Sequence, residues 1–313
     1  MKTAIKFDGG FFCIFTLMKK VLITGGTGLV GKRLSFLLAS IGYEVRVLSR
    51  SKSPESKYKT FLWNVNDQFI EDEAFQNLDY IIHLAGAGIA DKRWSDNRKK
   101  EIIDSRVEST NLLYNTSKRL KTPLKAFISA SATGYYGSVT TETIFTETDQ
   151  PATDFLGKVC RLWEESIFQF KNDKTRTVAL RTGIVLSNDG GALKKMKTPV
   201  ITPLGNGKQY MPWIHIDDLC ELYIKAIEDD GFEGAYNAVS SEHQTNYSFS
   251  KAIAKIFNKP FLPIGAPSFI LKIVFGEMAT IILNGSRVSN DKFMKTEFNF
   301  KFNNLDKALK NLK

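Results

Sequence analysis

The chain has 313 residues, of which 43% are hydrophobic and 24% are charged. These values are typical of a globular protein with a sizeable core, in one large domain or two smaller ones, and they exclude a disordered or fibrous chain. The net charge of +10 indicates a lysine-rich solvated surface, and because no nucleic-acid-binding motif accompanies it we expect no nucleic-acid partner.

The first 18 residues precede the elements of the predicted fold. Lys2 and Lys6 stand before an apolar run at 11–17, a pattern that weakly resembles a signal peptide, but no small-residue cleavage site follows. Met18 would be a natural start of the chain. We therefore expect residues 1–18 to be an N-terminal extension that is non-native or disordered.

A glycine-rich turn organises the first half of the chain. Residues 21–24 form an apolar run of strand character, glycines follow at 25, 28 and 31, and a helical pattern begins at once. This order is typical of a dinucleotide-binding motif, in which glycines allow a tight turn, a close approach to the pyrophosphate and close helix packing. The free N–H groups of the new helix would face the anion. The candidate cofactor contacts are Gly25, Thr27, Gly28, Leu29, Val30 and Gly31.

The second strand, expected at 44–50, ends in Ser49 and Arg50. In NAD-binding enzymes an acidic residue near this position holds the ribose 2′-hydroxyl. A carboxylate would repel the 2′-phosphate of NADP, whereas an arginine can bind it bidentately. Arg50 therefore predicts NADP(H) rather than NAD(H) as the cofactor, and the alternative is a plain surface arginine.

Further strands are expected at 61–65, 80–88, 126–131 and 177–181, and helices at 97–120 and 155–170. Strands that alternate with helices predict an α/β fold, a doubly wound parallel Rossmann sheet, with a smaller C-terminal substrate-side region. The fourth strand ends in small residues, and among them Ala85 and Gly86 are candidate cofactor contacts, because a strand tip that a cofactor crosses must be small. His83, inside the apolar run of that strand, is interpreted as a core histidine.

Six segments occur in an order that resembles the extended short-chain dehydrogenase/reductase superfamily, the group of nucleotide-sugar epimerases and dehydratases. They are TGGTGLVG, HLAGAG, SASATGYYG, RTGIVL, PWIHIDDL and YNAVS. GAGIADKRW, SRVEST and the tail from Pro267 resemble more closely the atypical YfcH-like branch, often labelled "epimerase family protein". The resemblance implies an NAD(P)-binding Rossmann domain over residues 19–265 and a small C-terminal domain over 266–313.

The superfamily's chemistry uses a serine and a Tyr-x-x-x-Lys pair. The tyrosine transfers a proton as hydride moves to or from the nicotinamide, the lysine lowers the tyrosine pKa and binds the nicotinamide ribose, and the serine orients the substrate. Ser131 matches the serine and Lys158 the lysine, but Asp154 stands four residues before Lys158. Tyr135 and Tyr136 lie near the same strand tip. The resemblance thus implies Ser131, Lys158 and Tyr136 as catalytic candidates, with Lys158 also a cofactor contact.

Some positions depart from the superfamily's pattern. Asp154 cannot reproduce the proton chemistry of a phenol, so either another group supplies the proton or this catalysis is lost. Arg106 stands where the superfamily commonly has an asparagine, and it either carries charge toward an anionic ligand or faces solvent. His215 and Asp217 are interpreted as mainly structural, with Asp217 able to cap a helix from Leu219 onward.

Other features of the sequence bear on disulfides, metal ions, cellular compartment and partners. The three cysteines lie far apart and His215 and His243 show no metal-ligand spacing, so we expect no disulfide framework, no metal, and a reducing, cytoplasmic compartment. No apolar run reaches the roughly 18 residues of a membrane span, which predicts no membrane partner. Superfamily members often form homodimers, and this is an analogy only.

Three functions are compatible with these observations. The leading hypothesis is an NADP(H)-binding oxidoreductase or epimerase-like enzyme that acts on an unidentified small molecule. The alternative is a non-catalytic NADP(H)-binding regulator linked to cell division. The third, a nucleic-acid-associated protein, rests on net charge alone.

Overall fold

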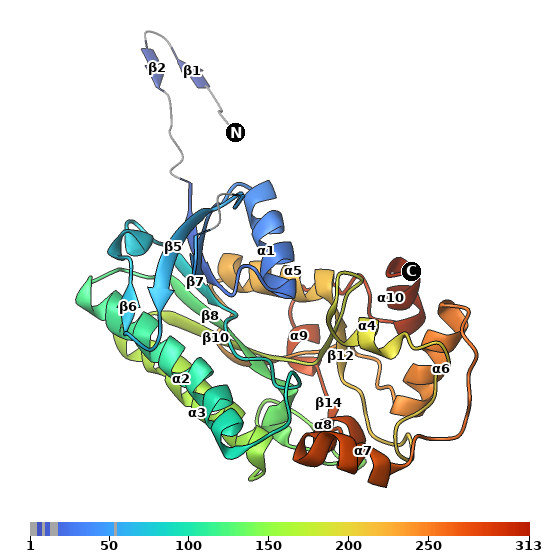
Figure 1. Cartoon of the computed structure of the whole chain (residues 1–313). Helices are drawn as coiled ribbons and strands as arrows, with labels where there is room; N and C mark the ends of the chain where they lie inside the picture. The colour runs from blue at the N-terminus through green and yellow to red at the C-terminus, as the bar shows by residue number, and fades with distance from the viewer. Residues whose placement is uncertain (1–4, 8–9, 13–17, 53–54) are drawn as a thin grey trace.

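The computed structural model describes residues 5–7, 10–12, 18–52 and 55–313. Most of the predicted N-terminal extension, residues 1–18, lies outside the described residues. Within them, β1 (Ile5–Phe7) pairs antiparallel with β2 (Gly10–Phe12). The elements that follow build a sheet with helices on both faces and a group of shorter elements beside it (Figure 1).

An eight-stranded sheet organises the described chain. Its strands are β3 (Lys20–Thr24), β4 (Glu44–Ser49), β5 (Lys59–Asn64), β6 (Phe69–Ile70), β7 (Tyr80–His83), β8 (Ala126–Ala132), β10 (Arg176–Thr182) and β13 (Gly234–Ala238). Every neighbouring pair is parallel except β5 with β6, which confirms the predicted Rossmann-type α/β sheet. Because both faces of a parallel sheet are covered, its central strands are continuous apolar runs, and Val21, Leu22 and Ile23 are fully buried.

The direction in which the sheet grows reverses at β3. The spatial order is β13-β10-β8-β7-β3-β4-β5-β6, so the chain first adds β4, β5 and β6 on one side of β3 and then crosses to the other side for β7 and the rest. In sheets of this kind ligands bind outside the carboxyl ends of the strands at the point of reversal. The crevice beyond the ends of β3 and β7 is therefore where this fold positions a site.

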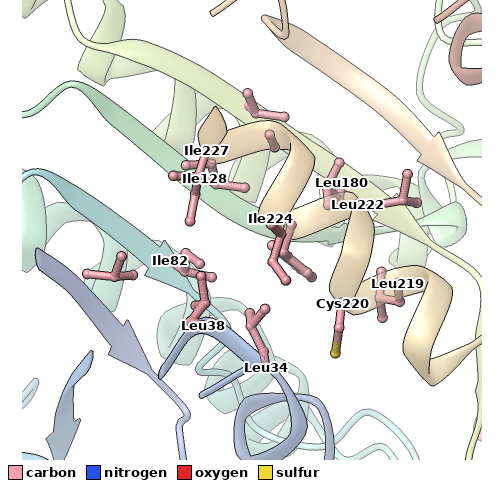
Figure 2. Packing of buried hydrophobic residues seen from close by; sticks show 14 of the residues in the cluster. Leu34, Leu38, Ile82, Ile128, Leu180, Leu219, Cys220, Leu222, Ile224 and Ile227 are labelled. Carbon is pink, nitrogen blue, oxygen red and sulfur yellow. The ribbon is translucent and has the colours of Figure 1, made fainter. Parts of the chain in front are cut away.

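Two pairs of helices cover the two faces of the sheet. On one face, α1 (Leu29–Ser40) and α5 (Ile216–Glu228) share a core, in which Leu34 and Leu38 meet Leu219 and Ile224 over the strands (Figure 2). On the other face, α2 (Asp96–Arg119) and α3 (Phe155–Phe168) enclose a second core that includes Trp163. Each fully buried large aliphatic side chain contributes about 1.5–3 kcal/mol relative to exposure, so the two cores hold the sheet rigid beneath its carboxyl edge.

The chain after β8 also supplies shorter elements at that edge. They are β9 (Ile144–Phe145), β11 (Ile184–Leu186), β12 (Trp213–His215), β14 (Arg287–Val288), α4 (Gly191–Met196), α6 (Asn246–Ile256), α7 (Ser268–Phe275), α8 (Thr280–Leu283), α9 (Asp291–Met294) and α10 (Leu305–Asn311). Short 3-10 turns are η1 (Asp72–Phe75), η2 (Thr133–Tyr136), η3 (Gln169–Asp173) and η4 (Gly276–Ala279). A third core joins α4, α6 and α10.

Three local differences from the sequence prediction have physical reasons. The strand expected at 80–88 ends at His83, because the next N–H groups turn to donate to the side chain of Thr24. The helix expected from Leu219 begins at Ile216, and its cap is not Asp217: Nδ1 of His215 accepts from the Asp217 N–H at 3.1 Å. The sequence pattern does not predict β13, because GAYNA carries no apolar run.

Candidate functional site

The glycine turn closes the end of β3 against the end of β7. The N–H of Gly28 donates to the carbonyl of Gly25 at 2.9 Å. Gly25 has a φ of +67°, and a Cβ on it would lie 3.0 Å from the backbone N of Ala85. A Cβ on Gly31 would lie 2.2 Å from the Gly25 carbonyl oxygen. Only glycine fits at 25 and 31, and Gly28, the N-cap, brings no side chain between the first N–H groups of α1 and an anion.

A buried hydrogen-bonded chain fixes the two strand ends to α2. The Thr24 hydroxyl accepts from the N–H groups of Leu84 and Ala85, both at 3.1 Å, so its own proton is left for Nδ1 of His83 at 2.7 Å. Nε2 of His83 then carries the ring proton and donates to the Ser109 hydroxyl at 3.1 Å. Burial lowers the pKa of His83 to about 3. His83 is therefore a neutral core histidine, as the sequence indicates.

The remaining predicted cofactor contacts lie along the same edge. Arg50 follows the last residue of β4, whose register pairs Leu48 with Thr24, and its side chain is exposed. Ala85 and Gly86 follow β7. Gly191, with a φ of +73°, places its ideal Cβ position 3.1 Å from Cδ2 of Leu29. The start of α4 therefore lies against the start of α1, where it borders the glycine turn.

Ser131 belongs to a buried polar network rather than to an open strand tip. Its hydroxyl donates to Oε1 of Glu164 on α3 at 2.6 Å. Arg181 on β10 donates to the same carboxylate through Nε and Nη2, both at 2.8 Å. The side chains of Glu164 and Arg181 are 6% and 4% exposed, respectively. This geometry is a bidentate buried ion pair, and it occupies the hydroxyl that the sequence assigned to substrate orientation.

Tyr136 continues this network toward the C-terminal segment. Nη1 of Arg181 donates to the Tyr136 hydroxyl at 2.9 Å, and that hydroxyl donates to Oδ1 of Asn237 at 2.6 Å. Nδ2 of Asn237 donates to the carbonyl of Ser289 at 2.9 Å. Burial raises the pKa of Tyr136. Its hydroxyl is thus committed within the protein, whereas the neighbouring Tyr135 lies half-buried with its ring centroid 3.4 Å from Cζ of Arg181.

The structure does not bring Lys158 together with Ser131. Lys158 is exposed on α3, and Asp154 is the N-cap of that helix, accepting from the N–H of Gly157 at 2.8 Å. The side chains that face the tip of β8 are Leu156 and Cys160, which lie 3.4 and 3.6 Å from the ideal Cβ position of Gly134. Residues two apart on a helix point about 200° apart, so Lys158 and Cys160 cannot share a face.

Leu156 and Cys160, which are four residues apart, are therefore the side chains of α3 that lie next to the tip of β8. Burial raises the pKa of Cys160 to about 12, which keeps its thiol protonated and unreactive. The i, i+4 row of Leu156, Cys160 and Glu164 could have been found from the apolar periodicity of the helix. The lysine that the sequence motif selects, Lys158, lies on the exposed face of the same helix.

Arg106 lies at the same strand tip, on the α2 side. Its Nη1 donates to the carbonyls of Ala87 and Ile102, both at 3.0 Å. Its guanidinium carbon lies 3.2 Å from the ideal Cβ position of Gly86 and 5.0 Å from the centroid of the Trp163 ring. Burial lowers the pKa of Arg106, although a guanidinium stays protonated. The sequence left open whether this arginine faces solvent, and the structure places it largely inside.

The described residues include neither a cluster of metal-ligand side chains nor a helix suited to a membrane. Among residues 18–52 and 55–313 and the short N-terminal strands, no three His, Cys, Asp or Glu side chains gather in a way that could hold a metal ion. In the same part of the chain, none of the helices has the length and apolar content needed to cross a bilayer.

Known proteins resemble this chain over most of its length. A 34% identical relative, an "Epimerase family protein" of Staphylococcus aureus, aligns over 302 residues and covers 94% of this chain and 99% of its own. The crystal structure of human epimerase family protein SDR39U1 with NADPH has a TM-score of 0.83 and 30% identity, and covers 94% of this chain and 98% of its own. A nucleoside-diphosphate sugar epimerase from Corynebacterium glutamicum has a TM-score of 0.75 and 28% identity, over 93% of this chain and 57% of that one.

Family models match both parts of the chain. Residues 266–312 match a model described as "Domain of unknown function (DUF1731)", and residues 21–238 match the model "NAD dependent epimerase/dehydratase family". The second match spans the sheet, the glycine turn and the strand tips described above. A nucleotide cofactor site at the carboxyl edge of the sheet follows from this match together with the geometry of the turn. The chain belongs to the NAD-dependent epimerase/dehydratase family.

Proposed function

We propose that the protein binds NADP(H) and acts as an oxidoreductase or epimerase-like enzyme on a small molecule. The observation that carries the cofactor preference is the exposed arginine, Arg50, directly after β4 and beside the glycine turn. No acidic residue stands there to hold a 2′-hydroxyl, and a guanidinium can bind a 2′-phosphate through two hydrogen bonds. The similar human protein, whose structure was determined with NADPH, supports this preference.

The residues of this chain would divide the work of binding. The N–H groups at the start of α1 would face the diphosphate, Gly28 would allow its close approach, and Gly25 and Gly31 would hold the turn and the helix against the strand ends. Ala85 and Gly86 are small and would leave room for the dinucleotide where it crosses the tip of β7. The nicotinamide, when bound, supplies or accepts hydride. Leu29 and Gly191 would limit access of water from the α1 side.

Proton transfer requires a donor near the tip of β8. Neither Leu156 nor Cys160 is a proton donor near neutral pH, since burial raises the Cys160 pKa to about 12. Tyr136 donates its hydroxyl to Asn237, so we propose it, with Ser131, as a positioning residue of the network around Arg181. Tyr135 is then the phenol to test first as the proton donor.

Calorimetric titration of NADPH and NADH into wild-type protein and Arg50→Ala tests the cofactor. We expect wild type to bind NADPH more tightly, and Arg50→Ala to narrow that preference by about tenfold, because a charge-assisted bidentate contact is lost. Arg161→Ala is the matched control, since Arg161 is an exposed arginine paired with Glu165 on α3. Equal affinity of wild type for the two cofactors would contradict the role of Arg50.

A screen for NADPH oxidation with nucleotide sugars, quinones and aldehydes tests turnover. On any substrate found, Tyr135→Phe should reduce kcat if Tyr135 donates the proton. Lys158→Ala decides the sequence-based assignment: loss of turnover would support it, and retained turnover, which the exposed position of Lys158 favours, would remove it.

A specific observation favours the alternative, a cofactor-binding regulator without turnover. The face of α3 that looks at the β8 tip presents an aliphatic side chain and a protonated thiol, Leu156 and Cys160, where the family's chemistry needs a phenol and an ammonium. NADPH binding without oxidation by any compound in the screen would support the regulator.

A further inference from the structure

We propose that Arg106 recognises an anionic group of the substrate, a carboxylate or a phosphate, at the nicotinamide end of the cofactor crevice. The inference rests on the proposed function, because it names the class of molecule that the same site would take. It goes beyond that function because nothing in the cofactor assignment requires a charged substrate.

The first support is the charge of Arg106, which has no acidic partner. Among the described residues, each of the other buried or partly buried arginines forms an ion pair with a carboxylate. These pairs are Arg33–Asp217, Arg46–Glu44, Arg98–Glu101, Arg176–Asp230, Arg181–Glu164 and Arg287–Glu142. The hydrogen bonds that the Arg106 guanidinium makes within the described residues go to two backbone carbonyls, and no carboxylate there forms a salt bridge with it. A desolvated cation is costly unless it is paired, so a ligand anion would complete this position.

The second support is the hydrogen-bonding capacity that the protein leaves free. A guanidinium has five N–H donors, and both protein hydrogen bonds of Arg106 come from Nη1, at 3.0 Å to Ala87 and 3.0 Å to Ile102. Nε and Nη2 therefore carry donors with no acceptor among the described residues. Together they form one edge of the guanidinium, which is the edge that binds a carboxylate or phosphate bidentately.

The third support is where the guanidinium lies. The diphosphate site is at the end of β3, at the start of α1 on one face of the sheet. Arg106 reaches the edge from α2 on the opposite face, beside Gly86 at the β7 tip. It also lies close enough to Cys160, which faces the β8 tip, for each to shift the pKa of the other. Arg106 therefore lies at the ends of β7 and β8, away from the N–H groups at the start of α1 that would hold the diphosphate, so we assign it to the nicotinamide half and the substrate.

The fourth support is the rigidity of the arginine. Its Nη1 is held by two carbonyls, and its guanidinium lies beside the Trp163 ring. The loop it contacts is held in turn: the N–H of Ala87 donates to the Ser105 hydroxyl at 3.0 Å, and Nη2 of Arg98 donates to the carbonyl of Gly88 at 2.5 Å. A preorganised cation of this kind binds an anion without first losing side-chain entropy.

The test uses full-length protein saturated with NADPH and two probes, inorganic phosphate and sodium acetate. Binding of a probe next to the nicotinamide is followed by the fluorescence of the bound reduced nicotinamide. Sodium chloride keeps the ionic strength constant during the titration. We expect the wild-type complex to bind at least one probe and Arg106→Gln to bind it at least about tenfold more weakly. Arg106→Lys should be intermediate, because an ammonium lacks the bidentate edge. Arg93→Gln, which removes an exposed arginine before α2, should match wild type.

The possible outcomes distinguish the anion site from the proposed function on which it rests. Loss of probe binding in Arg106→Gln with NADPH affinity retained supports a substrate-anion site. A loss of NADPH affinity of tenfold or more in Arg106→Gln, with the melting temperature retained, assigns the anion to the cofactor's own diphosphate and overturns the proposal. Probe binding that is absent in wild type, or equal in Arg106→Gln, also overturns it. If Arg106→Gln does not fold, Arg106→Lys decides in the same way. Failure of wild type to bind NADPH at all refutes the proposed function instead.

Discussion

Replacing Glu164 by Gln should strongly destabilise the protein. The Glu164 carboxylate accepts two hydrogen bonds from Arg181 at 2.8 Å and one from Ser131 at 2.6 Å, and both charged side chains are almost completely buried. An amide removes the negative charge and turns an N–H₂ toward the guanidinium, which leaves Arg181 as an uncompensated buried cation. Breaking a buried pair from one side costs about 3–5 kcal/mol.

Urea denaturation monitored by circular dichroism measures this change in the free energy of unfolding. At about 2–4 °C per kcal/mol, the melting temperature of Glu164→Gln should also fall by about 6–20 °C. Glu165→Gln is the matched control: it removes an exposed carboxylate that pairs with Arg161 one helical turn earlier, and it should change stability by less than about 0.5 kcal/mol. A loss for Glu164→Gln no larger than that of the control would refute the reasoning.

Two further predictions concern the edge of the sheet. Gly31→Ala places a Cβ 2.2 Å from the Gly25 carbonyl oxygen, so the turn must shift. We expect the free energy of unfolding to fall by about 1–3 kcal/mol and NADPH to bind more weakly. Gly231→Ala is the control, since a Cβ there would meet only the tip of the Asp229 carboxylate, and it should retain both stability and NADPH affinity. Burial lowers the pKa of His83 from 6.5 to about 3 in the folded protein, so an unfolded chain takes up a proton there at a higher pH than the folded one. The free energy of unfolding should therefore be highest above pH 6.5 and decline as the pH falls toward 3. Between pH 6.5 and pH 5 the decline should be about 2 kcal/mol. Urea titrations at those two pH values should show this decline in wild type and a smaller one in His83→Gln.

The sheet and the cofactor edge could be predicted from the sequence because their determinants are local. The glycine turn needs residues 25, 28 and 31 to be glycine for reasons that act within seven residues, and the strands are runs of apolar side chains. The short edge strand β13 escaped prediction because its place in the sheet depends on pairing with β10, more than 50 residues earlier in the chain. Pairing with a distant strand, and not the composition of the segment, determines whether such a segment forms a strand.

The catalytic assignment from sequence was limited for a different reason. The Tyr-x-x-x-Lys motif lacks its tyrosine in this chain, so it can be aligned with the helix in several registers. The alignment on Lys158 selects one of these registers. The structure shows that the register is set by burial: Leu156, Cys160 and Glu164 face the strands, and Lys158 faces solvent. Glu164 and Arg181 lie 17 residues apart on different elements, and no spacing rule predicts that they meet over Ser131.

Arg106 and Cys160 lie at the same end of the sheet, Arg106 beside Gly86 and Cys160 beside Gly134, and charge at the two positions is best considered together. The two side chains shift each other's pKa, so an ammonium at position 160 would lie beside the guanidinium in a poorly solvated site. We therefore expect Cys160→Lys to lower the free energy of unfolding strongly, and Arg106→Asn to relieve much of that loss because it removes the like charge.

A double-mutant cycle over Arg106→Asn and Cys160→Lys measures this interaction directly. Urea denaturation of the two single variants and the double variant should give a favourable coupling energy of at least about 1 kcal/mol, as contacting residues do. The cycle with Arg93→Asn in place of Arg106→Asn should give none, since Arg93 is exposed. Additive losses in both cycles would mean that the two positions are independent. A coupled result would mean that this strand tip accommodates one positive charge, so that Arg106 and a lysine at position 160 exclude each other.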